Sequence, residues 1–132
     1  MIELVKLNEI YKCDICGNVV SVLEAGDGEL ICCGQPMILL EEKTSKDEGN
    51  EKHVPIVELD DNRVIVRIGS KPHPMEAKHY IELVQIVKNG QVIAGKRLNP
   101  SEKPEAEFCL EESAEGITAR ILCNIHGLWK SH

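Results

Sequence analysis

The sequence predicts an all-β protein in which a small cysteine-rich metal domain precedes an antiparallel β domain. Three observations support this prediction. Aromatic residues make up only 3% of the chain, so its core must be built from Val, Ile and Leu, which suit strands. Apolar runs are short and broken by turn residues, and helical periodicity never persists for three turns. Four of the six cysteines fall within the first 40 residues.

Composition excludes several classes of function. The net charge is −7 and the pI is near 5.2, without the clustered Lys and Arg that nucleic-acid binding requires. No apolar run approaches the roughly 20 residues that cross a bilayer, so no membrane span is expected. The first six residues lack the basic start and apolar stretch of a secretion signal, which predicts a cytoplasmic protein. In that compartment, six cysteines favour metal binding or redox chemistry over disulfides.

The chain is expected to divide into a first domain at residues 1–40, a charged linker at 41–52 and a second domain at 53–132. The linker contains no large apolar residue. Within the second domain, Asn89-Gly90 predicts a two-residue hairpin turn. The strand spacing is typical of an antiparallel sandwich or barrel. The expected strands cover Val54 and residues 56–59, 64–68, 81–87, 91–94, 105–110 and 117–122.

The first candidate metal site is a group of four cysteines. A C-x2-C turn is followed, after fifteen intervening residues, by an adjacent pair. Four thiolates in tetrahedral geometry suit zinc or a single iron, and this choice stays open. Adjacent cysteines predict a distorted site, and a disulfide between them is disfavoured by strain. Gly17 and Gly34 follow the pairs, where the backbone must bend around a metal. The candidate ligands are Cys13, Cys16, Cys32 and Cys33.

The second candidate metal site combines histidines with one cysteine. These residues fall in short polar loops beside the expected strands, and the last two have C-x2-H spacing. Five nitrogen and sulfur ligands exceed what zinc normally takes, whereas they suit iron with one octahedral position left open. His132, at the end of the chain, is expected to be a surface or satisfied core histidine and not a ligand. The candidate ligands are His53, His73, His79, Cys123 and His126.

Two charged residues, Glu51 and Lys52, directly precede His53. They are interpreted either as a solvated linker pair or as catalytic groups. If His53 binds a metal, both side chains lie near its open face. A lysine there would attract an anionic ligand, and a glutamate could occupy or protonate the vacant position.

In their order along the chain, these motifs resemble the desulfoferrodoxin family, the two-iron superoxide reductases. The resemblance covers essentially the whole chain. The matching segments are Cys13-Asp14-Ile15-Cys16-Gly17-Asn18, Cys32-Cys33-Gly34, Glu51-Lys52-His53-Val54-Pro55, His73-Pro74-Met75-Glu76, Lys78-His79-Tyr80-Ile81, Pro104-Glu105-Ala106-Glu107-Phe108 and Cys123-Asn124-Ile125-His126-Gly127.

The resemblance implies a desulforedoxin/rubredoxin-like domain with an Fe(Cys)4 centre, then an immunoglobulin-like antiparallel β-sandwich with an Fe(His)4Cys centre. The four cysteines named above would hold the first iron. The four histidines would surround the second, with Cys123 axial. The implied activity is superoxide reductase, which reduces superoxide by one electron to hydrogen peroxide in detoxification and oxidative-stress defence. Implied partners are superoxide, a rubredoxin or similar electron donor, and a second copy in a homodimer.

One cysteine, Cys109, has no role in the family's sites. It is expected to be a buried structural thiol because it sits in the strand-like run Phe108-Cys109-Leu110.

Two other functional classes remain as alternatives: a rubredoxin-like electron carrier and a zinc-stabilised binding module. A dismutase is the nearest enzymatic rival. Metal analysis and oxygen evolution distinguish these alternatives.

Overall fold

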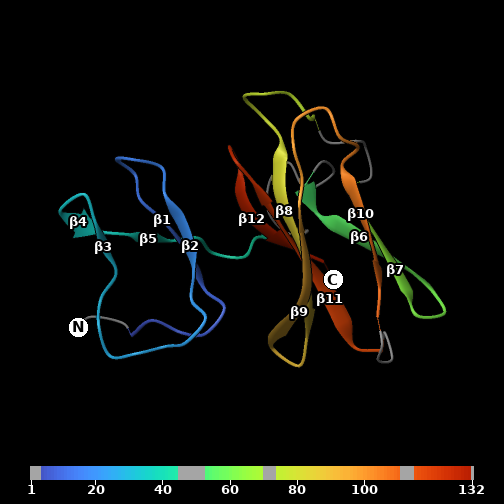
Figure 1. Cartoon of the computed structure of the whole chain (residues 1–132), viewed down its shortest axis with the longest axis horizontal. Coiled ribbons are helices and arrows are strands. Elements are labelled where there is room, and N and C mark those ends of the chain that lie inside the picture. Colours follow the sequence, from blue (N-terminus) through green and yellow to red (C-terminus); the bar gives the residue numbers. More distant parts are fainter. Residues whose placement is uncertain (1–3, 45–52, 70–73, 111–114, 132) are drawn as a thin grey trace. The chain divides into compact units, whose positions relative to one another are not determined.

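The structure is a computed structural model that describes residues 4–44, 53–69, 74–110 and 115–131. Contacts within the chain divide it into two compact units, Met1–Leu40 and Glu41–His132 (Figure 1). The named elements within the described residues are all β-strands. No helix in this part of the chain has the length and apolar character needed to cross a membrane.

The first unit is a small arrangement of short strands. The strand order β2-β1-β5 forms one sheet, and β3 pairs with β4 in a separate antiparallel hairpin. Among its described hydrophobic residues, only Ile10, Cys13 and Val22 are buried. So small a core supplies little hydrophobic stabilisation by itself. The strands are β1 (Ile10–Lys12), β2 (Val19–Ser21), β3 (Ile31–Cys32), β4 (Gln35–Pro36) and β5 (Ile38–Leu39).

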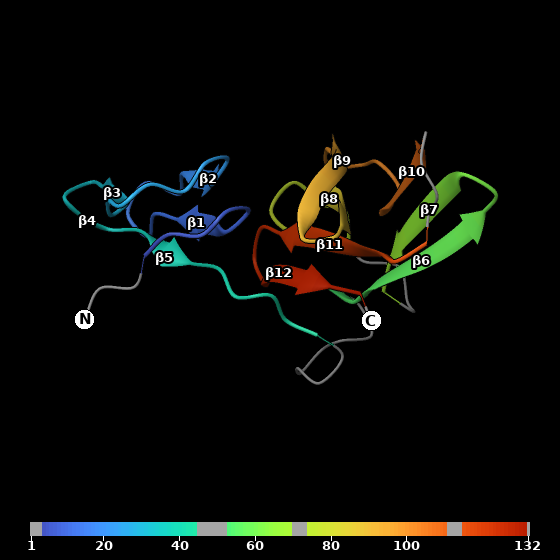
Figure 2. The same ribbon diagram turned by 90° about the horizontal axis from the view of Figure 1, so that it is seen from below.

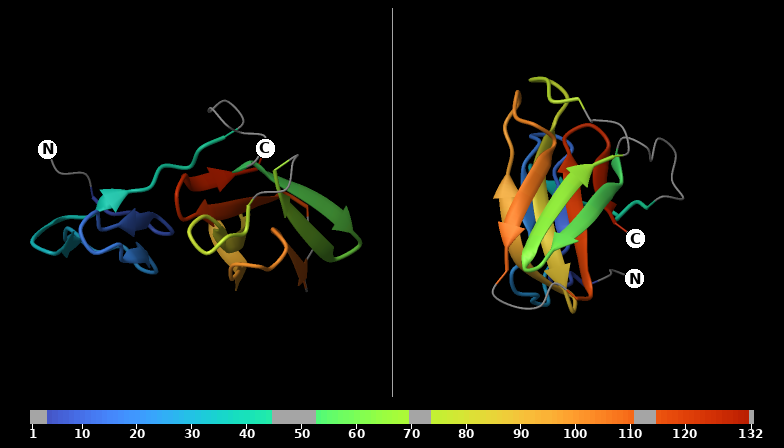
Figure 3. Two further views of the ribbon diagram at one scale, coloured as in Figure 1. Left: turned by 90° about the horizontal axis from the view of Figure 1, so that it is seen from above. Right: turned by 90° about the vertical axis from the view of Figure 1, so that its right-hand side faces the viewer.

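The second unit is a sandwich of two antiparallel sheets, drawn as separate layers in Figures 2 and 3. One sheet has the order β10-β7-β6 and the other has the order β12-β11-β8-β9. This arrangement confirms the predicted fold class. The strands are β6 (Pro55–Asp60), β7 (Arg63–Ile68), β8 (Ile81–Lys88), β9 (Gln91–Arg97), β10 (Glu105–Cys109), β11 (Ile117–Cys123) and β12 (Gly127–Lys130).

An aliphatic core fills the space between the two sheets. Alternate residues of each strand point inward, because successive side chains of a strand face opposite sides. The core also contains Trp129, the single tryptophan. Burying each large aliphatic side chain stabilises the fold by roughly 1.5–3 kcal/mol. The members of this core include Val64, Val66, Ile68, Ile81, Val84, Ile86, Ala119 and Ile121.

The hairpin prediction is confirmed at β8 and β9, whose register pairs Lys88 with Gln91. Asn89 and Gly90 have φ values of 52° and 76°, as a two-residue hairpin turn requires. Strand β12 was not among the strands expected from the sequence. That strand is only four residues long and directly follows the turn that carries the last candidate ligands.

The expectation that Cys109 is buried is wrong. Cys109 does lie in a strand, the last residue of β10, but its side chain is exposed. Ala106 and Phe108 are the residues of β10 that face the core, so alternation turns Cys109 outward with Glu105 and Glu107. The apolar neighbours of Cys109 in the sequence suggested that its side chain faces the core, whereas it faces outward.

Candidate metal centres

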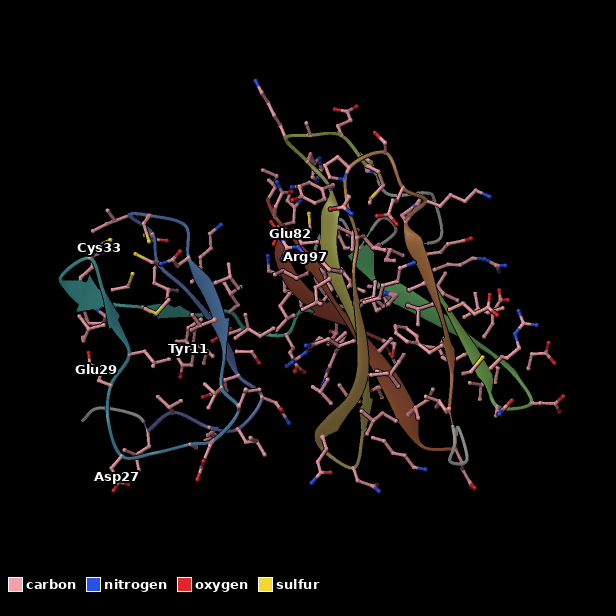
Figure 4. All side chains as sticks on the ribbon, in the orientation of Figure 1. Tyr11, Asp27, Glu29, Cys33, Glu82 and Arg97 are labelled. Atoms are coloured by element: carbon pink, nitrogen blue, oxygen red, sulfur yellow. The ribbon has the colours of Figure 1, made fainter. Side chains whose placement is uncertain are left out.

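Four thiols of the first unit converge at two tight turns. Their sulfur atoms all lie within 4.8 Å of one another. The Sγ atom of Cys32 lies 3.5 Å from that of Cys16 and 4.0 Å from that of Cys33. In Figure 4, yellow sulfur atoms gather in the turns beside the labelled Cys33. The residues brought together are the four that the sequence analysis named: Cys13, Cys16, Cys32 and Cys33.

The local backbone explains this convergence. Gly17 and Gly34 have φ values of 82° and 76°, a conformation that favours glycine. Cys33 itself has a φ of 52°, which lets an adjacent cysteine turn its side chain toward the same point as Cys32. The amide of Cys16 donates to the Sγ atom of Cys13 at 3.5 Å. Amide donation of this kind is a common second layer around a metal-bound thiolate.

The thiols do not share one protonation behaviour. The amide of Cys16 lowers the pKa of Cys13 to about 7, whereas hydrogen bonds with Cys16 and Cys13 raise the pKa of Cys33 to about 12. Four sulfurs this close cannot all be thiolates unless a cation balances them. A tetrahedral ion that prefers thiolates, zinc or iron, fits this set.

Three histidines and a cysteine of the second unit meet at one end of the sandwich. His53 lies two residues before β6, His79 lies two residues before β8, and Cys123 ends β11. His126 lies in the turn between β11 and β12. Because β11 and β8 are antiparallel, the end of one lies beside the start of the other. The fold thus gathers residues that are more than 70 positions apart in sequence.

The donor atoms of this histidine cluster lie within 4.8 Å of one another. His53 Nε2 is 3.0 Å from His126 Nδ1, and Cys123 Sγ is 3.8 Å from the same Nδ1 atom. The ring centroids of His79 and His126 are 4.9 Å apart. His53 and Cys123 are buried, whereas His126 is exposed, so one side of the cluster faces solvent. Imidazole nitrogens with one thiolate suit iron.

The position of Cys123 depends on an irregularity in the sheet. The register between β11 and β8 shifts between Leu122 and Cys123. Bulges of this kind re-aim side chains next to functional sites. Burial raises the pKa of the Cys123 thiol, and hydrogen bonding by the amides of His126 and Ile125 acts in the opposite direction. The His126 amide donates to Sγ at 3.5 Å. These amides prepare the sulfur to carry the negative charge of a metal ligand.

Trp129 and Asn124, which were not assigned to the site from the sequence, contact the cluster or the residues beside it. The indole of Trp129 stacks on the His53 ring at a centroid distance of 4.8 Å, and its Nε1 atom donates to the His126 carbonyl at 3.1 Å. Asn124 accepts from the Tyr80 amide at 2.9 Å and donates to the Lys78 carbonyl at 3.0 Å. Their only sequence signal is their location, inside or just past the C-x2-H turn.

Replacing Asn124 with alanine tests whether it positions His79, since its two partners are the neighbours of that histidine on either side. Asn124→Ala is expected to lower the free energy of unfolding by about 1–2 kcal/mol. It is also expected to weaken iron binding at the histidine cluster by ~10-fold. Thermal unfolding and chelator competition measure the two effects. Asn124→Asp keeps the acceptor for the Tyr80 amide, so its stability and iron affinity should lie between those of the wild type and Asn124→Ala. Unchanged iron affinity in Asn124→Ala would contradict this role.

Four residues named in the sequence analysis lie outside the described residues: Glu51, Lys52, His73 and His132. The described part of the histidine cluster therefore contains His53, His79, Cys123 and His126. Together with the thiol cluster, it defines the class of protein: a metalloprotein with one sulfur-only centre and one separate imidazole–thiolate centre.

Comparison with known proteins gives the family. The desulfoferrodoxin profile matches residues 45–132, and the profile of the desulfoferrodoxin N-terminal domain matches residues 6–40. The desulfoferrodoxin of Nitratidesulfovibrio vulgaris is 52% identical over 123 residues, which cover 93% of this chain and 94% of that protein. The chain belongs to the desulfoferrodoxin family.

Two solved structures are similar. The superoxide reductase from Treponema pallidum aligns with a TM-score of 0.74 at 24% identity, covering 94% of this chain and 97% of that one, and supports the fold. The one-iron superoxide reductase from Giardia intestinalis aligns with a TM-score of 0.55 at 29% identity. That alignment covers 61% of this chain and 94% of the Giardia protein.

Proposed function

We propose that this protein is a superoxide reductase that uses two iron ions, one in an Fe(Cys)4 centre and one in an Fe(His)4Cys centre. One superoxide, one electron and two protons give one hydrogen peroxide. The observation that carries the proposal is the histidine cluster, where three imidazoles and a buried thiol meet at the partly open end of the sandwich. His73 would supply the fourth imidazole. Relatives with the same fold are named superoxide reductases.

The proposed mechanism divides the work among residues of the chain. When bound, iron in the histidine cluster supplies the electron and an exchangeable position for a small anion. Cys123 would hold it from the core side, because its sulfur is buried and receives amide hydrogen bonds. A thiolate ligand pushes electron density onto the metal. Lys52 would draw the superoxide anion toward a protein of net charge −7, and Glu51 would offer a carboxylate at the open face.

Rapid mixing of superoxide with the reduced protein tests the activity, together with an iron count. The proposed two-iron superoxide reductase would contain two irons per chain and yield peroxide without oxygen. Evolution of oxygen alongside peroxide would indicate a dismutase instead. An electron carrier would contain only the tetrathiolate iron, and a zinc-stabilised binding module would be colourless. Oxygen evolution, a single tetrathiolate iron or a colourless protein would each overturn the proposal.

Replacing Lys52 with alanine tests the attraction of the anion. Lys52→Ala is expected to slow the second-order reaction with superoxide by roughly 10-fold at low ionic strength, because the variant lacks the cation that the proposal assigns to the open face. Added salt should reduce the difference in rate between Lys52→Ala and the wild type, since exposed charges are screened. Lys96→Ala is the matched control, as it makes the same change in net charge on β9. Equal rates for Lys52→Ala and wild type at low salt would remove Lys52 from the mechanism.

Several finer features belong to the same proposal. The electron donor is a rubredoxin or a similar small redox protein, and the chain acts as a homodimer. The protein works in the cytoplasm, which is consistent with the absence of disulfides among its six cysteines, all of which lie in described segments. The domain boundaries are residues 1–40 for the first centre, 41–52 for the linker and 53–132 for the reductase domain.

A further inference from the structure

The segment that leads into the sandwich is attached to the edge of its four-stranded sheet. The Lys43 amide donates to the Leu128 carbonyl at 2.8 Å, and the Lys130 amide donates to the Lys43 carbonyl at 2.9 Å. Lys43 thereby forms a parallel bridge with Trp129 of β12. The backbone of this segment is thus fixed beside the strand that carries the indole.

A side-chain contact next to Lys43 strengthens this attachment. Glu42 accepts a hydrogen bond from Arg120 at 3.2 Å and lies 3.8 Å from the ammonium of Lys130. The Arg120 side chain is only 5% exposed and also binds Gln85 with two of its nitrogens. A nearly buried guanidinium needs a carboxylate partner, and among the ion pairs of the described residues Glu42 provides it.

The side chain of Lys43 extends from this anchored backbone to the histidine cluster. Its ammonium donates to the His126 carbonyl at 3.0 Å and lies 5.3 Å from the centre of the Trp129 ring. The His126 carbonyl therefore receives two donors, the ammonium and the indole N–H. The same indole stacks on His53. One lysine thus contacts both the turn that carries one imidazole and the ring that supports another.

We propose that Lys43 is a positioning residue of the histidine cluster, which holds the His126 turn and the Trp129 indole in the arrangement that binds iron. This inference rests on the proposed assignment of the cluster as an iron centre. The Lys43 ammonium donates to the His126 carbonyl and not to a donor atom, so it positions the ligands through His126 and Trp129, while its charge also lowers the pKa of the nearby Cys123 thiol. Replacing groups that orient metal ligands in this way typically weakens metal binding by about 10–100-fold.

Lys43→Met tests the proposal, because methionine keeps an unbranched apolar side chain but removes the ammonium. Fe²⁺ is titrated anaerobically into metal-free protein, and quenching of Trp129 emission is followed. Trp129 is the single tryptophan and stacks on His53, so its emission reports on this cluster. Lys43→Met is expected to weaken Fe²⁺ binding by ~10-fold. Lys43→Arg retains a cation and its donors and should restore binding. Lys96→Met, on β9, is the matched control.

A second measurement separates this inference from the proposed function. Acrylamide quenching of the metal-free protein reports directly on the Trp129 indole, which is 2% exposed. Quenching should rise in Lys43→Met and stay at the wild-type level in Lys43→Arg and Lys96→Met. Wild-type Fe²⁺ affinity and wild-type acrylamide quenching in Lys43→Met would overturn the role of Lys43, as would an equal loss in Lys96→Met. Failure of the wild-type protein to bind Fe²⁺ would instead overturn the proposed function.

Discussion

Replacing Cys13 with serine is expected to unfold the first unit while the sandwich stays folded. The described part of this unit buries only Ile10, Cys13 and Val22 among its hydrophobic residues. Units of about 40 residues usually need a metal, disulfides or a partner to remain folded. The cysteines form no disulfide, and four thiols that converge on one point can hold an ion, so we expect a metal bound there to supply most of the stabilisation. Structural metal sites of this size contribute on the order of 10 kcal/mol.

Hydrogen exchange measures this effect residue by residue. In Cys13→Ser, amide protection in β1, β2 and β5 should be lost, whereas protection in β8 and β11 should match that of the wild type. The rate of superoxide reduction should also be retained, because the histidine cluster belongs to the other unit. Cys109→Ser is the matched control, as Cys109 is an exposed thiol outside both clusters. Persistent protection in β1 of Cys13→Ser would contradict a structural role for the metal.

The second large effect is expected from Cys123→Ser. A serine hydroxyl fills nearly the same space but is a much poorer ligand for iron than a thiolate, since the thiolate is the form that binds metal. The rate of superoxide reduction should fall by more than ~100-fold, beyond the range seen for changes around the ligands. The altered residue is 1% exposed, so solvent cannot replace the lost sulfur without a local rearrangement.

Near-ultraviolet circular dichroism of Trp129 verifies that the Cys123→Ser variant stays folded, because the indole packs in the core beside the cluster. The absorption of the tetrathiolate centre should be unchanged. Cys109→Ser again serves as the control and should react as the wild type does. A Cys123→Ser protein that reduced superoxide at the wild-type rate would show that Cys123 is not a ligand of the reactive metal.

The sequence was most informative where spacing and turn chemistry carried the signal. Asn89-Gly90 specified the hairpin, and β-branched runs located the strands of the sandwich except β12, because both depend on local backbone preference. The C-x2-C turn and the adjacent cysteine pair also placed four thiols in one cluster. Such motifs constrain the fold over a few residues, so they can be read without knowledge of tertiary structure.

The residues that support the metal ligands through tertiary contacts were not predicted. Trp129 and Lys43 carry no metal-binding chemistry of their own, and the pairing of β12 with β11 and with the segment around Lys43 brings them to the cluster. Asn124 lies inside the C-x2-H turn, but its hydrogen bonds with Tyr80 and Lys78 depend on the fold. The outward direction of Cys109 depends on the register of β10 against β7. A shift of one residue in that register would reverse every side chain of the strand.

X-ray absorption at the iron edge of the Cys13→Ser variant tests the central claim most directly, because the sulfur-only centre is then removed. The claim is that imidazoles from distant loops and the Cys123 thiolate share one iron. The predicted result is a retained iron with a single sulfur neighbour and otherwise nitrogen or oxygen neighbours. Loss of all iron from a sandwich that remains folded, or an iron surrounded by nitrogen and oxygen alone, would contradict it.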